Sequence, residues 1–248
     1  MKNQKNSSTQ SDLPTEVSQS DVVLEQVASA LSHDIRTPLR HTQHFLDFFE
    51  SSLEQPISQE SEENMALVRS GLQTASQMVE TLIAFARLDQ NVDRHTLLRI
   101  PDLVGEAMYR TRIGLDVPDA SLSVTGQAHV AGNEMLLLSL FAHLFDNCVM
   151  FMPEGQPAKI SVSMEETSED KVLVTIDDNG EGVRGTSEAA FRLFQSGLKN
   201  RKGQGLGVGL SFARRIAEIH GGELTITEQA SPLGGARLCL VLPKPPAV

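Results

Sequence analysis

Apolar residues recur at helical spacing in two segments of the first third of the chain. The first set is Leu24, Val27, Leu31 and Ile35, and the second is Val68, Leu72, Ala75, Val79, Leu82 and Ala86. Spacings of three and four residues are typical of the seam of a helical bundle or coiled coil. The pattern therefore predicts one helix from about residue 21 to residue 53 and a second one through residues 68–86, with Pro56 in the turn.

Two helices of this kind bury little apolar surface by themselves. Pairing with a second copy would complete a four-helix bundle, so we predict that this antiparallel hairpin forms a homodimer. Pro38 falls inside the first predicted helix and has no backbone N–H, and we expect it to weaken or kink that helix.

After a junction near residues 89–95 the pattern becomes mixed. Strand-like runs occur at 97–100, 121–124, 159–164, 172–176, 223–227 and 237–242, with helical patterns between them. This order predicts an α/β sandwich, in which helices cover one mixed sheet. Residues 1–20 are polar with almost no large apolar side chains and are predicted to be a disordered leader. We therefore divide the chain into the leader 1–20, the hairpin 21–91 and the α/β domain 92–248.

Composition narrows the class of protein. The chain has only 2 cysteines, Cys148 and Cys239, and its polar start has no signal-peptide core, so we predict reduced core cysteines and a cytoplasmic location. The most apolar stretch, residues 135–151, contains His143, Asp146 and Asn147, which favours a buried helix over a membrane span. A formal net charge of −11 argues against direct binding to nucleic acid.

His33 and Asp34 form a candidate catalytic pair in the first predicted helix. At about 100° per residue, His33 points away from the apolar stripe of Leu31 and Ile35. An imidazole nitrogen can act as a nucleophile when a neighbouring carboxylate takes up or shares its proton. Taken alone, however, a solvated surface histidine explains this pair more often than a nucleophile does.

A second group of motifs lies more than a hundred residues downstream. Residues 177–183 (DDNGEGV) directly follow a strand-like run, and residues 203–210 (GQGLGVGL) lead into a helical pattern. Glycine allows close approach of the backbone to a phosphate, and the helix N-terminus offers free N–H groups. The polar residues of the apolar helix need partners, which a metal-bound nucleotide would supply. Each loop alone would fit an ordinary turn, but their order and spacing favour a nucleotide site.

Together these residues resemble the two-component sensor histidine kinases. In that family a helical dimerisation and phosphoacceptor domain precedes an ATP-binding domain of the gyrase, Hsp90, histidine kinase and MutL type. Residues 33–38 match the H box, whose histidine accepts the γ-phosphoryl group. Asn147 matches the Mg²⁺-binding asparagine, and Asp178 matches the carboxylate that hydrogen-bonds the adenine amino group. Further nucleotide-binding matches are Gly180, Gly182, Gly203, Gly205, Gly207, Gly209 and Leu210.

The resemblance also extends to the segment before the second glycine loop. Phe191 and Phe194 resemble the paired phenylalanines that precede the nucleotide lid. Lys199, Arg201 and Lys202 would then lie in a lid over the polyphosphate, although for each single cation a solvated loop remains the better explanation.

Two positions depart from the family pattern. His143 stands where an earlier asparagine is usual, and Met150 stands where a lysine is usual. A ring nitrogen of His143 could contact Mg²⁺ or phosphate, with a hydrogen-bonded core histidine as an equal alternative, whereas a thioether cannot replace a cation. The sequence thus predicts modest nucleotide affinity.

The resemblance implies an enzyme that transfers a phosphoryl group from Mg·ATP to His33, with Asp34 as base, and then to an aspartate of a separate response regulator. Thr37 matches the polar position of the family's phosphatase activity, so we expect a bifunctional protein. No sensory domain is recognisable, so either a partner delivers the input or the chain is a fragment. The alternatives are a degenerate scaffold that binds nucleotide weakly and docks a receiver domain or another kinase, and an ATPase that would not need His33.

Overall fold

The computed structural model describes residues 19–52, 58–91, 96–167, 169–183, 186–194, 205–227, 229 and 231–245, including their side chains except at 19–34 and 90–91. It divides between Ala86 and Arg87 into two compact units. Most of the predicted leader, residues 1–18, lies outside the described residues. Within the described part, no helix is long and apolar enough to cross a membrane.

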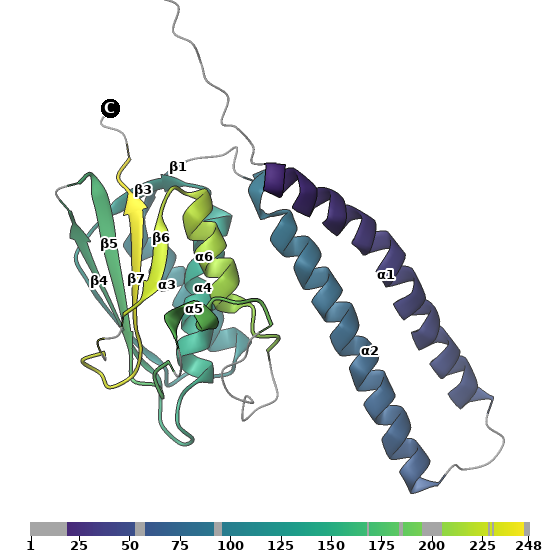
Figure 1. Ribbon diagram of the computed structural model, residues 1–248. Helices are drawn as coiled ribbons and strands as arrows, with labels where there is room; N and C mark the ends of the chain where they lie inside the picture. Colours follow the sequence, from purple (N-terminus) through teal and green to yellow (C-terminus); the bar gives the residue numbers. More distant parts are fainter. Residues whose placement is uncertain are drawn as a thin grey trace, which may run out of the picture. The chain divides into compact units, whose positions relative to one another are not determined.

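The first unit is a helical hairpin, as predicted. It consists of α1 (Gln19–Ser51) and α2 (Gln59–Ala86), which pack along each other (Figure 1). Arg69 of α2 joins the helices by donating to Asp47 at 2.7 Å and to Glu50 at 2.5 Å. α1 continues through Pro38, so the proline does not end the helix.

The second unit is the predicted α/β sandwich. Its sheet has the order β2-β4-β5-β7-β6, in which only β2 and β4 are parallel neighbours. The helices α3, α4 and α6 pack on one another and cover one face of this sheet (Figure 1). Its elements are η1 (Leu88–Asn91), β1 (Thr96–Arg99), α3 (Ile100–Gly114), β2 (Ser121–Thr125), β3 (His129–Gly132), α4 (Glu134–Met150), β4 (Lys159–Glu166), β5 (Lys171–Asp178), α5 (Ser187–Ala190), α6 (Gly209–Ile219), β6 (Glu223–Ile226) and β7 (Arg237–Pro243).

One predicted strand does not belong to the main sheet. β1 instead pairs antiparallel with β3, a strand that the hydrophobic pattern did not predict. A run of four residues with two glycine or alanine positions carries little periodicity, which explains the omission. Ile100, predicted as the end of β1, is the first residue of α3, with Pro101 in the first turn where a missing N–H costs nothing.

The core between helices and sheet explains where the site forms. Val172, Val174 and Ile176 alternate along β5 and are fully buried, as expected for a strand with one face against a helical layer. α4 buries apolar residues over most of its surface, including Phe141 and Phe145. The polar residues of α4 and the acidic end of β5 are therefore held on rigid elements.

Candidate functional site

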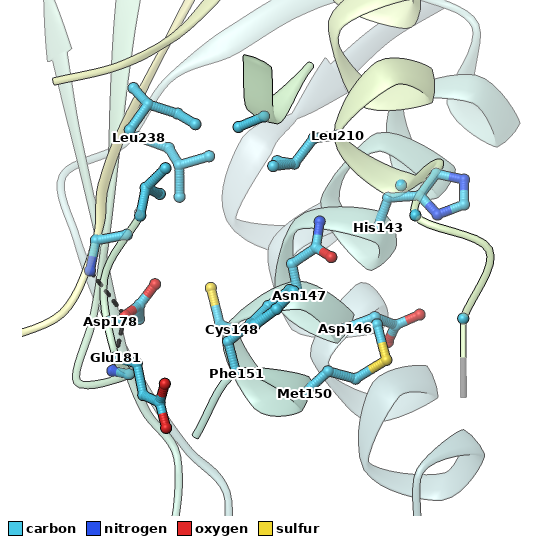
Figure 2. Close-up of a pocket in the computed structure, with 18 of the residues that line it drawn as sticks. His143, Asp146, Asn147, Cys148, Met150, Phe151, Asp178, Glu181, Leu210 and Leu238 are labelled. Atoms are coloured by element: carbon cyan, nitrogen blue, oxygen red, sulfur yellow. Dashed lines mark hydrogen bonds between the residues drawn. The ribbon is translucent and has the colours of Figure 1, made fainter. Parts of the chain in front are cut away.

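A cavity of about 610 Å³ lies between the end of β5, α4 and the start of α6 (Figure 2). It brings together side chains or backbone from segments that are far apart in the sequence. The predicted site residues that line it are His143, Asn147, Asp178, Gly180, Gly182, Gly205, Gly207, Gly209 and Leu210. Its apolar wall includes Phe151, Leu206, Ile226 and Leu238. A largely apolar cavity with a few convergent polar groups is typical of a small-molecule site.

Asp178 is the last residue of β5 and only 5% exposed. Its Oδ1 accepts hydrogen bonds from the backbone N–H groups of Gly180 at 2.8 Å and Ala236 at 2.9 Å (Figure 2). Burial raises the pKa of the carboxyl above its ordinary value, although these two N–H groups act to lower it. The backbone thus fixes one oxygen of the carboxylate and leaves the other out of both bonds.

Gly235 and Ala236 contact Asp178 in the candidate site, and the sequence analysis missed both. A Cβ on Gly235 would collide with the carboxylate of Asp178 and the N–H of Gly180, so only glycine fits there. Ala236 contributes only its backbone N–H. The paired glycines before the last strand were the available sign of a close backbone approach.

Asn147 projects from α4 into the cavity (Figure 2). Its buried Nδ2 has no hydrogen-bond partner among the described residues. The amide lies against Gly209, where a Cβ would stand 3.2 Å from Nδ2. An unpaired amide is unfavourable in a folded protein, so its place in a cavity wall points to a ligand. Because the amide oxygen and nitrogen are interchangeable by a flip, this group can present either a donor or an acceptor.

His143 and Asp146, the other two polar residues of α4 at this site, have different contacts. His143 lies one turn before Asn147, with its ring 5.6 Å from the ring of Phe212, and burial lowers its pKa against the opposing charge of Asp146. Asp146 accepts a hydrogen bond of 2.7 Å from the Thr111 hydroxyl. The expectation that all of these polar groups need a bound ligand is therefore wrong for Asp146, whose partner comes from α3.

The second glycine loop enters α6 directly. Gly205 and Gly207 have φ values of 119° and 68°, which favour glycine, and α6 begins at Gly209 without a side-chain cap. Uncapped N–H groups at the start of a helix attract an anion such as phosphate. Gly203 and the predicted lid cations Lys199, Arg201 and Lys202 lie outside the described residues.

The segment before that loop packs on α6. Ser211 donates a hydrogen bond of 2.8 Å to the carbonyl of Phe191, and the Arg214 guanidinium lies 4.9 Å from the centre of the Phe191 ring. Phe194 lines the cavity with a φ of 61°. The two phenylalanines therefore have different places, one in the core and one at the cavity.

The donor set of the cavity fits a magnesium ion that arrives with a nucleotide. Among the described residues, no group of three or more His, Cys, Asp or Glu side chains could hold a metal alone. The unpaired amide of Asn147 offers one oxygen after a flip, and Mg²⁺ usually takes most of its ligands from phosphate and water. His143, whose pKa is lowered by burial, lines the same cavity and is a second candidate ligand through a ring nitrogen.

The predicted catalytic residues lie on α1 of the hairpin. The backbone of His33 and Asp34 is helical, and their side chains are outside the described set. Thr37 is half-buried one turn further along, whereas His41 and His44 are exposed. These positions come from the first unit, separate from the cavity of the second.

The sandwich and its cavity define an ATP-binding module of the class that histidine kinases share with gyrase and Hsp90. Residues 132–246 match the family model described as "Histidine kinase-, DNA gyrase B-, and HSP90-like ATPase", and residues 23–91 match the "His Kinase A (phospho-acceptor) domain". With both modules in this order over most of its length, the chain belongs to the sensor histidine kinase family. The resemblance inferred from the motifs is confirmed.

Curated relatives agree with this assignment. The sensor-type histidine kinase PrrB of Mycobacterium tuberculosis is 32% identical over 227 residues, which cover 88% of this chain and 47% of PrrB. The phytochrome-like protein Cph1 of Synechocystis is 21% identical over 232 residues, which cover 93% of this chain and 30% of Cph1. The chain thus spans less than half the length of these relatives.

Solved structures share the fold. The mycobacterial sensor histidine kinase MprB has a TM-score of 0.53 at 21% identity, with 60% of this chain and 99% of that chain covered. Full-length ShkA, solved in complex with AMPPNP, has a TM-score of 0.59 at 18% identity and covers 88% of this chain, with 46% of ShkA matched.

Proposed function

We propose that this protein is an ATP-dependent histidine kinase that phosphorylates His33 and passes the phosphoryl group to an aspartate of a separate response regulator. One observation carries the proposal. The unpaired amide of Asn147 opens into the same cavity as the buried carboxylate of Asp178 and the uncapped start of α6. An apolar wall, an acidic acceptor, an amide and a phosphate-type helix end are what a nucleotide requires.

Each group has a place in nucleotide binding. Asp178 accepts the adenine amino group through the carboxylate oxygen that the backbone leaves out, while the apolar wall contacts the base. The N–H groups at Gly209 and Leu210 and the backbone at Gly205 and Gly207 contact the phosphates, as the lid cations would. Asn147 holds Mg²⁺, with His143 as its second candidate ligand. When bound, the ion supplies neutralisation of phosphate charge.

Residues of the helical hairpin carry out the phosphoryl transfer. An imidazole nitrogen of His33 forms a bond to the γ-phosphorus as the bond to the bridging oxygen breaks, and ADP leaves with that electron pair. Asp34 takes up or shares the proton of the other ring nitrogen, which keeps the ring nucleophilic. The phosphoryl group then moves to a carboxylate of the regulator and frees His33.

Exposed apolar side chains support the proposed homodimer. Phe45 and Phe48 of α1 are 72% and 71% exposed, and Leu67 of α2 is 70% exposed. A second hairpin would bury this surface in a four-helix bundle. Use of ATP and the free cysteines suit a cytoplasmic location.

Replacement of Asn147 tests the nucleotide half of the proposal. In Asn147→Ala we expect ATP affinity in Mg²⁺ to fall at least about tenfold, to the level that the wild type shows in EDTA. The melting temperature should stay within about 2 °C, because the lost amide nitrogen has no partner to forfeit. Calorimetric titration with ATP in each buffer measures this, and a variant that still responds to Mg²⁺ would contradict the role of Asn147.

Thr37 is proposed to orient a water for the phosphatase activity, one helical turn after His33. Thr37→Ala should keep ATP-dependent labelling and slow loss of phosphate from the phosphorylated regulator about tenfold. Thr42→Ala is the matched control, since the Thr42 hydroxyl is exposed and donates to the Pro38 carbonyl of its own helix at 2.8 Å. If the wild type, Thr37→Ala and Thr42→Ala dephosphorylated the regulator at the same rate, the phosphatase role of Thr37 would be wrong.

A further inference from the structure

Asn179 directly follows Asp178, the last residue of β5, and its side chain joins two segments of the chain. Its Oδ1 accepts a hydrogen bond of 2.7 Å from the Lys159 N–H, and its Nδ2 donates one of 3.2 Å to the Pro157 carbonyl. Only this orientation of the amide serves both groups, because an N–H needs an acceptor and a carbonyl needs a donor. Asn179 therefore fastens the turn after β5 to the segment that enters β4.

These two hydrogen bonds take the place of backbone pairing at the end of the ladder between β4 and β5. The last pair of this ladder is Ile160 and Asp178, and the next pair along the two strands would be Lys159 and Asn179. At that position the side chain of Asn179 accepts from the Lys159 N–H, so the backbone of Asn179 is released from the ladder. β5 therefore separates from β4 directly after Asp178.

The turn that begins there holds the carboxylate of Asp178. Within this turn the Gly180 N–H donates back to Oδ1 of Asp178 at 2.8 Å, and the Glu181 N–H donates to the Phe151 carbonyl at the end of α4 at 3.1 Å. Asn179 is the residue between Asp178 and Gly180. Its attachment to β4 therefore fixes the part of the backbone that places the Gly180 N–H against the carboxylate.

We infer that Asn179 is a positioning residue for adenine specificity, because it holds the turn in which Gly180 binds the Asp178 carboxylate. This inference rests on the proposed function, in which Asp178 accepts the amino group of adenine. Asn179 lies outside the cavity lining, so it acts through the turn and not by contact with the nucleotide. A carboxylate held by fixed donors loses little conformational freedom when the base binds.

Two nucleotides separate an effect on base recognition from an effect on the fold. The triphosphate of purine riboside differs from ATP only in carrying hydrogen in place of the amino group. A substitution that only loosens the domain weakens both nucleotides and leaves the ratio of their affinities unchanged, and a charge that acts on the phosphates does the same. By calorimetric titration we expect the wild type to favour ATP at least about tenfold, the effect of one hydrogen bond to a charged group.

Asn179→Ala removes both side-chain hydrogen bonds and should lower this ratio about fivefold. Asn179→Asp keeps an oxygen for the Lys159 N–H and should stay within about twofold of the wild type. Thr167→Ala is the matched control, because the Thr167 hydroxyl also bonds two backbone groups, the Glu169 N–H and the Lys171 carbonyl, at the opposite end of β4 and β5. It should leave the ratio unchanged.

An unchanged ratio in Asn179→Ala would overturn the inference. An equal fall in Thr167→Ala would overturn it as well, since any loosening of this strand pair would then lower the ratio. An equal fall in Asn179→Asp would show that the bond to Lys159 is not the one that positions the turn. A wild type with no preference for ATP would contradict the role proposed for Asp178, and this result is read without any variant.

Discussion

Asp178→Asn is expected to weaken ATP binding about 100-fold, a loss of about 2.7 kcal/mol. The amide keeps an oxygen that can accept from the N–H groups of Gly180 and Ala236. Its other atom becomes an NH₂ group, which meets the amino group of adenine donor to donor. The variant should therefore fold normally but lose the hydrogen bond to the amino group of adenine.

Stability and binding should move in opposite directions in this variant. Because burial raises the pKa of Asp178 in the folded protein, its ionised form costs stability at pH 7, and an uncharged amide avoids that cost. The cost exists above the folded pKa and disappears as pH falls below the ordinary value, where folded and unfolded chains are both protonated. We expect Asp178→Asn to melt at or above the wild-type temperature at pH 7, with the advantage lost in acid.

Asp177→Asn is the matched control for nucleotide binding. Asp177 precedes Asp178 but forms a two-point ion pair with Arg237, at 2.8 and 3.0 Å, and does not line the cavity. Titration with ATP should give an affinity within about threefold of the wild type. Equal losses of ATP affinity in Asp177→Asn and Asp178→Asn would show that these residues affect binding by stabilising the fold, and not by a contact of Asp178 with adenine.

His33→Gln is expected to abolish phosphorylation from γ-³²P-ATP while ATP affinity stays within about twofold. Glutamine keeps the helix but has no nucleophilic ring nitrogen. The cavity residues all come from the second unit, so the substitution leaves them untouched. His44→Gln, an exposed histidine on the same helix, is the control and should label as the wild type does.

A labelled His33→Gln protein would contradict the assignment of the phosphoacceptor. A wild type that binds ATP and takes up no label would favour the scaffold alternative, with His143 and Met150 as the first positions to examine. Turnover of ATP without protein labelling would favour an ATPase.

Periodic segments were predictable from the sequence because local spacing decides them. The spacing of four and three through Leu72 and Val79 predicted α2, and the alternation in β5 predicted a strand that ends at the acidic turn. β3 was missed because its four residues carry too little pattern, and β1 was assigned to the wrong sheet because strand pairing is a long-range choice.

Candidate site residues with polar side chains could also be named from the sequence, whereas contacts between distant segments could not be predicted. Thr111 satisfies Asp146 from 35 residues away, and Ala236 satisfies Asp178 from 58 residues away through a backbone N–H that no side-chain motif reveals. Cys148 was placed in the core because burial is its commonest role.

The most direct test of the central claim is the position and chemical stability of the label on the wild-type protein. After incubation with γ-³²P-ATP and Mg²⁺, we expect a label that is lost in acid, survives in base and maps by mass spectrometry to the peptide that carries His33. A label that survives acid, or that maps to a serine or threonine, would contradict phosphorylation of this histidine.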